Sequence, residues 1–443
     1  MAILQEPNAV FYHPLDDATE TLQAQAWSGS GTFPAGKVAT ALGPAPGPAA
    51  LSLSEFGPEH EFLGTASARQ SVARLTPTVF VVAYLSGTSV ILKVGTVSGA
   101  DITFGAGRGV GPAAHPSVTA INPTTFVIAF RDNADGGHGT TKVGTVSGTD
   151  ITFGADTEFE SAAGSSQIDA ATLDATKFIV VYREGATSDG LARVGTVTGT
   201  PIALGAPIPF QSAGDLDFVS MDTLSATSFV VAYRDASDSN HGIAKFGTVS
   251  GDGITFGAGA TFGGAGITDY NSVVGLSSTK FVVAYQDGGG GQRGHAKVGT
   301  VAGTFITFGA AAEFNAVPSS HHSTIALSPT TFVVAYRAGF AAPGTGATKV
   351  GTVTGTAVSF GPESKFLDAN GAVDISLGLL SAPAFVVAYT DVSDSSHGTA
   401  KVGNATVYPT AAGATRLAFS AWFRSPNTVP PTTAPPTTTA PPL

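Results

Sequence analysis

One short apolar run, Phe-Val-Val-Ala-Tyr or a close variant, occurs seven times in this chain and limits its possible folds more than any other feature. Successive copies begin 46 to 53 residues apart. A fixed period near 50 is typical of repeat architectures, in which each period is one unit that packs against the next. The copies begin at Phe80, Phe126, Phe178, Phe229, Phe281, Phe332 and Phe385.

Each period contains four short segments that predict four strands. An apolar segment such as residues 323–327 precedes the repeated run, and a Lys-Val-Gly-Thr-Val segment such as 349–353 follows it. The fourth segment is Ile-Thr-Phe-Gly, as at 306–309. All four are rich in β-branched and aromatic residues and are bounded by turn residues. Both alternating faces of the repeated run are apolar, so we expect neighbours to cover that strand on both sides.

Seven four-stranded units of this period predict an all-β fold, a seven-bladed β-propeller over residues 46–407. The chain resembles propeller repeat proteins, although the Gly-His and Trp-Asp signature of WD40 repeats is absent. Residues 56–63 match residues 360–367, so the chain enters the ring on a strand of the fourth type. It leaves on a strand of the third type at 401–407. We therefore expect the N-terminal strand to complete the last blade and close the ring.

The two flanks, residues 1–45 and 408–428, lie outside the repeat. Phe11-Tyr12-His13-Pro14-Leu15-Asp16-Asp17 resembles the opening of laminin-G/concanavalin-type jelly rolls, and residues 417–424 resemble a later strand of that family. This resemblance implies a small β module, built from the two termini, through which copies associate. The residues expected to make that assembly contact are Trp27, Phe419, Trp422 and Phe423.

Residues 429–443 form a tail of alternating Pro and Thr clusters. Such a composition favours an extended polyproline-type spacer and is similar to O-glycosylated stalks. The candidate O-glycosylation residues are Thr432, Thr433, Thr437, Thr438 and Thr439.

Charge and composition argue against several classes of partner. A net charge of −11 disfavours nucleic acid, and no apolar stretch is long enough for membrane insertion. The chain has no cysteine, which removes disulfides and thiolate metal sites, and we expect no cofactor. The N-terminus lacks the basic start and apolar run of a signal peptide. We therefore expect an extracellular or virion-surface protein that is released by another route.

Loop lengths predict that the two faces of the ring differ. The connections from first to second strand and from third to fourth strand are tight, as at Asn122–Thr125 and Ser147–Asp150. The other two connections are longer and vary among the repeats, and in an up-and-down blade they share one face. Loops on a rigid scaffold commonly carry binding residues, so we expect ligands on the face with the longer loops.

Three of these loops repeat an Asp-x-x-Asp-x-x-His pattern. Two carboxylates and an imidazole could hold a divalent cation or sugar hydroxyls. Alternatively, the Asp caps the turn and the His bonds locally. The spacing matches no EF-hand, we expect no metal, and the copies at Leu85, Glu184 and Ala338 exclude a site in every blade. The candidate binding residues are Asp132, Asp135, His138, Asp235, Asp238, His241, Asp391, Asp394 and His397.

Three further features of the sequence lead to structural expectations. Arg131, Arg183, Arg234 and Arg337 follow the repeated run and either clamp an anion or pair with acidic residues of the neighbouring loop. The adjacent His321 and His322 should point to opposite faces of a strand, so they cannot share a metal. The Gly of Lys-Val-Gly-Thr-Val, from Gly95 to Gly403, is best explained by close blade packing.

The sequence favours a non-catalytic protein. No Ser lies in a Gly-x-Ser-x-Gly motif with plausible partners, and the acidic residues recur with the repeat as structural residues do. A propeller glycosidase needs distinctive carboxylates at its channel instead. We expect a structural or adhesive surface subunit, a fibre or virion appendage that self-associates through its termini and tail. The alternative is a lectin-like propeller that binds glycans with the longer loops.

Overall fold

The computed structural model describes residues 50–408, except 213, 265, 340–343 and 369–370. The predicted terminal module, its assembly residues and the tail with its candidate glycosylation threonines lie outside the described residues. Every regular element in the described part of the chain is a β-strand. That part therefore contains no helix able to cross a membrane.

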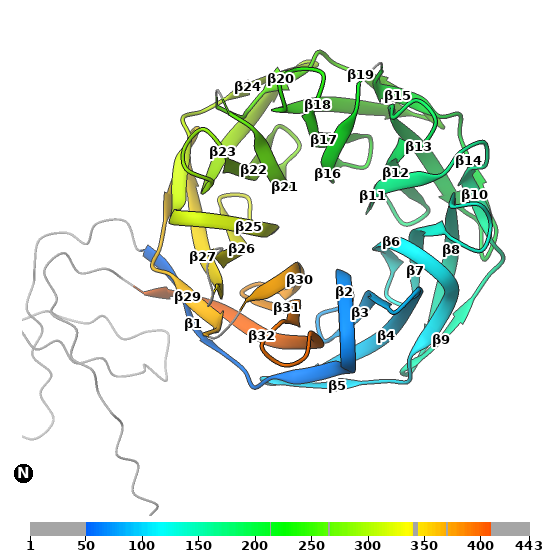
Figure 1. Ribbon diagram of the computed structural model, residues 1–443, viewed down its shortest axis with the longest axis horizontal. Helices are drawn as coiled ribbons and strands as arrows, with labels where there is room; N and C mark the ends of the chain where they lie inside the picture. Colours follow the sequence, from blue (N-terminus) through cyan, green and yellow to red (C-terminus); the bar gives the residue numbers. More distant parts are fainter. Residues whose placement is uncertain (1–49, 213, 265, 340–343, 369–370, 409–443) are drawn as a thin grey trace, which may run out of the picture. The chain divides into compact units, whose positions relative to one another are not determined.

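The strands form seven blades around a central channel, as predicted (Figure 1). Each blade has an inner strand, two middle strands and an outer strand, joined antiparallel. The inner strands are β2 (His60–Thr76), β6 (Arg108–Asn122), β11 (Ser165–Thr172), β16 (Leu216–Ser225), β21 (Thr268–Ser277), β25 (Ala312–Ser328) and β30 (Ala372–Ser381). In β2, β6 and β25 the first half is the outer edge of the preceding blade, and the second half is the inner strand.

The middle strands carry the repeated run and the Lys-Val-Gly-Thr-Val segment. The second strands are β3 (Val79–Ser86), β7 (Thr125–Asp132), β12 (Lys177–Glu184), β17 (Ser228–Asp235), β22 (Lys280–Asp287), β26 (Thr331–Ala338) and β31 (Ala384–Asp391). The third strands are β4 (Ser89–Ser98), β8 (His138–Ser147), β13 (Gly190–Val197), β18 (His241–Ser250), β23 (Arg293–Ala302), β27 (Thr345–Thr354) and β32 (His397–Tyr408).

The outer strand of each blade is broken into two pieces. In the fifth blade, β24 pairs with the second half of β23, and the start of β25 pairs with the first half. The first pieces are β5 (Asp101–Phe104), β9 (Asp150–Phe153), β14 (Ile202–Leu204), β19 (Gly253–Phe256), β24 (Phe305–Phe308), β28 (Ala357–Phe360) and, in the last blade, β1 (Ala50–Phe56). The separate second pieces are β10 (Thr157–Glu160), β15 (Ile208–Gln211), β20 (Ala260–Thr261) and β29 (Ser364–Leu367).

The second strands form the core, with both faces buried as the sequence predicts. In β17, Val231 packs toward the third blade, whereas Val230 packs toward the fifth blade and its Phe281. Adjacent residues of one strand thus fill two different blade interfaces. Burying an apolar side chain of this size contributes roughly 1.5 to 3 kcal/mol, so these strands account for much of the folding free energy.

The glycine of each third strand lies beneath an aromatic ring of its own blade. Gly299 is paired with Phe281 across β22 and β23, and a Cβ there would lie closer than 3.0 Å to the ring. All seven copies share this arrangement. The close packing expected at these glycines therefore occurs inside each blade. Close contacts between blades involve the Ile-Thr-Phe-Gly glycines, because Gly309 abuts the backbone of Thr356 in the next blade.

The ring is closed by the N-terminal strand, as predicted. β1 runs antiparallel to β32 with Ala50 opposite Tyr408, and the start of β2 pairs with the beginning of β32. Glu59, between them, accepts a hydrogen bond from Tyr389 at 3.1 Å and lies 2.9 Å from Lys401. Segments from the two ends of the propeller thus complete one blade and leave no open sheet edge there.

Replacing Gly299 by Ala should lower the free energy of unfolding by about 1 to 3 kcal/mol, because the added methyl collides with the Phe281 ring. Chemical denaturation of the variant and the parent protein measures the difference. Gly253→Ala is the matched control, since a Cβ there meets only Ser250 O at 3.5 Å. Equal stability of the two variants would contradict the proposed packing.

Candidate functional site

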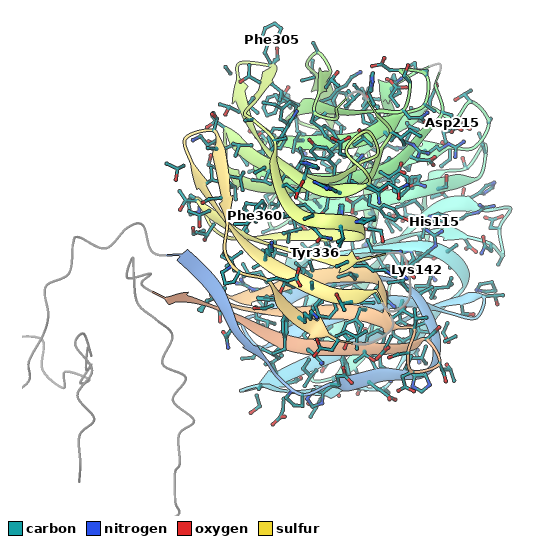
Figure 2. All side chains as sticks on the ribbon, turned by 60° about the vertical axis from the view of Figure 1, so that its left-hand side comes forward. His115, Lys142, Asp215, Phe305, Tyr336 and Phe360 are labelled. Carbon is teal, nitrogen blue, oxygen red and sulfur yellow. The ribbon has the colours of Figure 1, made fainter. Side chains whose placement is uncertain are left out.

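The two faces of the ring differ as the loop lengths predict. Connections from first to second and from third to fourth strands are short turns on one face, where Phe305 lies exposed. The opposite face carries the longer loops, and His115 and Asp215 lie on that side (Figure 2). The first blade is an exception, because its second and third strands are joined by a short turn between Ser86 and Ser89.

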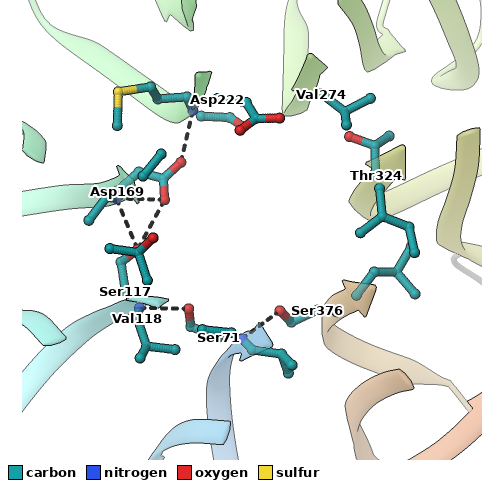
Figure 3. A pocket seen from close by; sticks show the side chains of 18 of the residues that line it. Ser71, Ser117, Val118, Asp169, Asp222, Val274, Thr324 and Ser376 are labelled. Carbon is teal, nitrogen blue, oxygen red and sulfur yellow. Dashed lines mark hydrogen bonds between the residues drawn. The ribbon is translucent and has the colours of Figure 1, made fainter. Parts of the chain in front are cut away.

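A circle of hydrogen bonds joins the seven inner strands around the channel, which has a volume of about 500 Å³ (Figure 3). In each blade a side-chain oxygen accepts a hydrogen bond from a backbone N–H of the next inner strand, at 2.8 to 3.1 Å. The bond from Val72 to Ser376 closes the circle. We call the acceptors the serine ring: Ser71, Ser117, Asp169, Ser220, Ser272, Ser323 and Ser376.

Two carboxyls line the channel, and the sequence analysis missed both. Asp169 replaces Ser in the serine ring, and Asp222 accepts a hydrogen bond from Gly275 of the next blade at 2.8 Å. Burial raises the pKa of Asp169 and of Asp222 to about 6 each. The expectation that acidic residues simply recur with the repeat fails here. Comparing the seven copies position by position would have shown both substitutions.

The channel carboxyls predict a pH dependence of stability. Because their folded-state pKa values lie above the ordinary 3.8, their contribution is fully present below about pH 4 and is lost as the pH rises through about 6. Asp169→Ser restores the residue of the other six blades and removes one such group. Relative to the parent protein, this variant should gain stability between pH 4 and 7, measured by thermal unfolding. Parallel stability curves for the two proteins would contradict this prediction.

The inner strands share a second feature, a β-bulge at the end that meets the longer loops. The residue two positions before the serine ring has a φ of +50° to +52° in every blade, and the strand register shifts there. We call these residues the mouth ring: Arg69, His115, Gln167, Phe218, Tyr270, His321 and Asp374.

The mouth ring holds side chains where glycine would be less strained. A left-handed backbone costs a non-glycine residue roughly 1 to 2 kcal/mol. The chain uses 56 glycines, yet none occupies this position in any blade. The backbone is the same seven times while the side chain takes six identities, two of them aromatic. Strain maintained in this way points to a use for the side chains themselves.

Neighbouring members of the mouth ring touch one another. Arg69 Nη1 lies 3.1 Å from His115 Nδ1, and the ring of Tyr270 lies between those of Phe218 and His321, at 4.9 and 5.1 Å. His321 Nδ1 accepts a hydrogen bond from the backbone N–H of Asp374 at 3.0 Å. An aromatic sector from blades four to six therefore stands across the channel from a basic sector on blades one and two (Figure 1).

Gln167 offers a direct test of the strain. Its side chain makes one hydrogen bond, to Asp217 at 3.3 Å. Gln167→Gly should raise the free energy of unfolding by up to about 1 kcal/mol, because relief of the left-handed backbone exceeds the extra entropy of glycine. Chemical denaturation measures the change. Gln167→Ala, which keeps the strain, is the control and should not gain stability.

The Asp-x-x-Asp-x-x-His loops lie apart from the mouth ring, on the outer part of the same face. The first Asp of each caps its turn, as Asp132 does by accepting the N–H of Ala134 at 2.9 Å. The other two copies, Asp235 and Asp391, accept equivalent bonds. The second Asp lies 3.2 to 3.5 Å from the His in the pairs Asp135–His138, Asp238–His241 and Asp394–His397. As ligand-binding residues, all nine stay a prediction.

In two of these loops a third acidic residue joins the pair. Glu158 completes a trio with Asp135 and His138, and Glu61 completes one with Asp394 and His397. The donor atoms of each trio lie within 4.8 Å of one another, a set that suits a divalent cation. The fourth blade has Thr261 in place of the Glu.

The arginines after the second strands divide into two kinds. Arg234 pairs with Asp217 and, at 2.5 Å, with Asp269 of the next blade, and Arg183 pairs with Asp215. Arg183 and Arg234 therefore agree with the ion-pair alternative. Arg131 and Arg337 form no ion pair with any described residue. Their cross-strand neighbours are Ala114 and Ser320, where Arg234 has Asp217.

The two adjacent histidines lie in different surroundings, as predicted. His321 belongs to the mouth ring, whereas His322 is buried against Phe314 at 5.2 Å between ring centroids. Burial lowers the pKa of His322 to about 3, so it is a neutral core residue.

Comparison with known proteins supports the fold. No protein-family model and no curated protein matches the sequence. The solved structure of the BP39L lectin from Burkholderia pseudomallei covers 79% of this chain and 99% of its own, with a TM-score of 0.55 at 14% identity. The chain is a β-propeller.

Two further solved structures match the chain with lower TM-scores. The Aleuria aurantia lectin in complex with α-methyl-L-fucoside has a TM-score of 0.42 at 11% identity, over 70% of this chain and 99% of that one. The Hadza microbial sialidase Hz136 has a TM-score of 0.43 at 10% identity, over 72% and 74%. Identities this low establish the fold alone.

Proposed function

We propose that this protein is a non-catalytic glycan-binding propeller whose ligand site is the mouth ring. The observation that carries the proposal is the mouth ring itself, seven strained positions that hold unlike side chains on an otherwise repeated backbone. The site lies on the face with the longer loops, as the sequence predicts. It is built by the inner strands, however, and not by the Asp-x-x-Asp-x-x-His loops.

The chemistry of the mouth ring suits a sugar. The Tyr270 ring offers an apolar surface to the C–H face of a pyranose, while planar polar groups such as Gln167 take paired hydroxyls. The guanidinium of Arg234 lies over the Phe218 ring, 5.0 Å from its centroid. Burial raises the pKa of Tyr270, so its phenol stays protonated and can donate a hydrogen bond. The ring also sits at the end of the central channel, where a ligand meets side chains from several blades.

A binding function fits the channel better than catalysis. Both channel carboxyls are engaged by backbone N–H groups, since Asp169 accepts from Ala170 and Met221, and Asp222 accepts from Thr223 and Gly275. Carboxyls that hold neighbouring blades together are poorly placed to exchange protons with a substrate. We therefore keep the prediction that the protein is not an enzyme.

The similar fold of BP39L, which is named a lectin, adds support to glycan binding. Among the described residues, no observation favours the structural-subunit function, and the segments expected to assemble lie outside them. A glycan-binding role also accords with the proposed location at an extracellular or virion surface.

Tyr270→Ala should weaken glycan binding by about tenfold or more, because one stacking platform of the mouth ring is lost. A glycan array screened at micromolar concentration identifies the ligand, and titration calorimetry compares the variants. Phe305→Ala, which removes an aromatic ring exposed on the opposite face, should bind as the parent protein does. Absence of any array ligand, or equal losses in both variants, would contradict the proposal.

A further inference from the structure

The basic sector of the mouth ring contains Arg69 and His115, and Arg131 of strand β7 lies next to it, opposite the residue that precedes His115. Arg69 is exposed at the mouth and donates a hydrogen bond from Nη1 to His115 Nδ1 at 3.1 Å. The charges of Arg69 and Arg131 both act on His115 and, together with burial as the largest cause, lower its pKa to about 4. His115 is therefore neutral near pH 7, and it orients Arg69 without adding charge.

No ion pair with a described residue neutralises this sector, although Asp374 of the seventh blade is the next member of the mouth ring beyond Arg69. Neither Arg69 nor Arg131 forms an ion pair with a described residue, and no carboxylate acts on His115. The arginines at the position of Arg131 in the third and fourth blades are each paired with aspartates. In the fourth blade the residue opposite the arginine is Asp217, whereas the residue opposite Arg131 is Ala114. Arg183 lies opposite Ser166 and pairs instead with Asp215 of the following loop.

Among the described residues Arg74, Arg108, Arg193 and Arg337 also form no ion pair, so what sets Arg69 and Arg131 apart is their place beside His115. With a net charge of −11, the protein has more acidic than basic residues. It nevertheless leaves two guanidinium groups unpaired at one side of the mouth. A guanidinium offers several donors in one plane and matches the geometry of a carboxylate or a sulfate. The aromatic sector across the channel can then hold the uncharged part of the same ligand.

We propose that Arg69, which contacts His115, and Arg131, which lies opposite the neighbouring Ala114, bind the anionic group of an acidic glycan. The group is a carboxylate, as in a sialic or uronic acid, or a sulfate ester, since both present coplanar oxygens to the arginines. This inference rests on the proposed glycan-binding function and adds the class of ligand. The sequence suggests four arginines after the second strands as candidates for anion binding. Of these four, the proposal keeps only Arg131.

The test uses the full chain and matched pairs of glycans that differ in one acidic group. Lactose and 3′-sialyllactose form one pair, and an unsulfated disaccharide with its sulfated form is another. The parent protein should prefer the acidic member by about tenfold or more, and added NaCl should weaken that preference. The pair that shows the preference identifies carboxylate or sulfate as the bound group.

Three variants assign the preference to residues. Arg69→Gln and Arg131→Gln should each reduce binding of the acidic member by about tenfold while binding of the neutral member changes little. Arg74→Gln is the matched control, because Arg74 lies exposed on the same strand β2 toward the other end of the channel. It makes the same change in charge and should leave the preference intact. Circular dichroism and thermal unfolding confirm that each variant is folded.

The outcomes separate the two proposals. Equal binding of neutral and acidic members, or a preference that survives both Arg69→Gln and Arg131→Gln, overturns the acidic-ligand inference and leaves glycan binding standing. A loss of preference in Arg74→Gln as large as in Arg69→Gln also overturns the inference, because it indicates a general charge effect. Failure to bind any member of any pair overturns the glycan-binding proposal itself.

Discussion

Seven inner strands that do not pair with one another must still be held in one circle, and a side-chain oxygen does this in every blade. Each member of the serine ring accepts a backbone N–H from the next blade, and the last bond returns to the first blade at Val72. The bonds occupy backbone donors that would otherwise face the channel without a protein partner. This circle fixes the spacing of the inner strands, and with it the position of every side chain at the mouth.

The bulge before each serine-ring residue links the architecture to the proposed binding site. A bulge adds one residue to a strand and changes the direction of the side chains next to it. The serine ring stays uniform because it holds the blades together, and six of its seven members are the same residue. The residue at the bulge is not needed to hold the blades together, so its identity can differ from blade to blade. Near-identical repeats thereby produce a mouth with a basic side and an aromatic side.

Much of the fold could be predicted from the sequence, because the repeated run, the turns and the match between residues 56–63 and 360–367 are local patterns. The mouth ring could not, since no residue type marks it. A left-handed φ at His115 or Phe218 is set by the strands on either side, whereas sequence cues for that conformation depend on Gly or Asn. When the seven repeats are aligned, Asp169 stands at a position that is Ser in the other six. Its location at the channel wall, however, depends on the register of β11 against β12.

The closing strand has a mechanical consequence. Ala50 and Tyr408 are paired, so both ends of the propeller leave from the same end of the β1–β32 ladder. A force that pulls the two flanks apart loads the backbone hydrogen bonds of this ladder one after another, as a zipper opens, and the peak resistance is low. A force applied between a ligand at the proposed site and one flank would take a different path through the blades. The ring would thus withstand traction from a bound surface better than separation of its own ends.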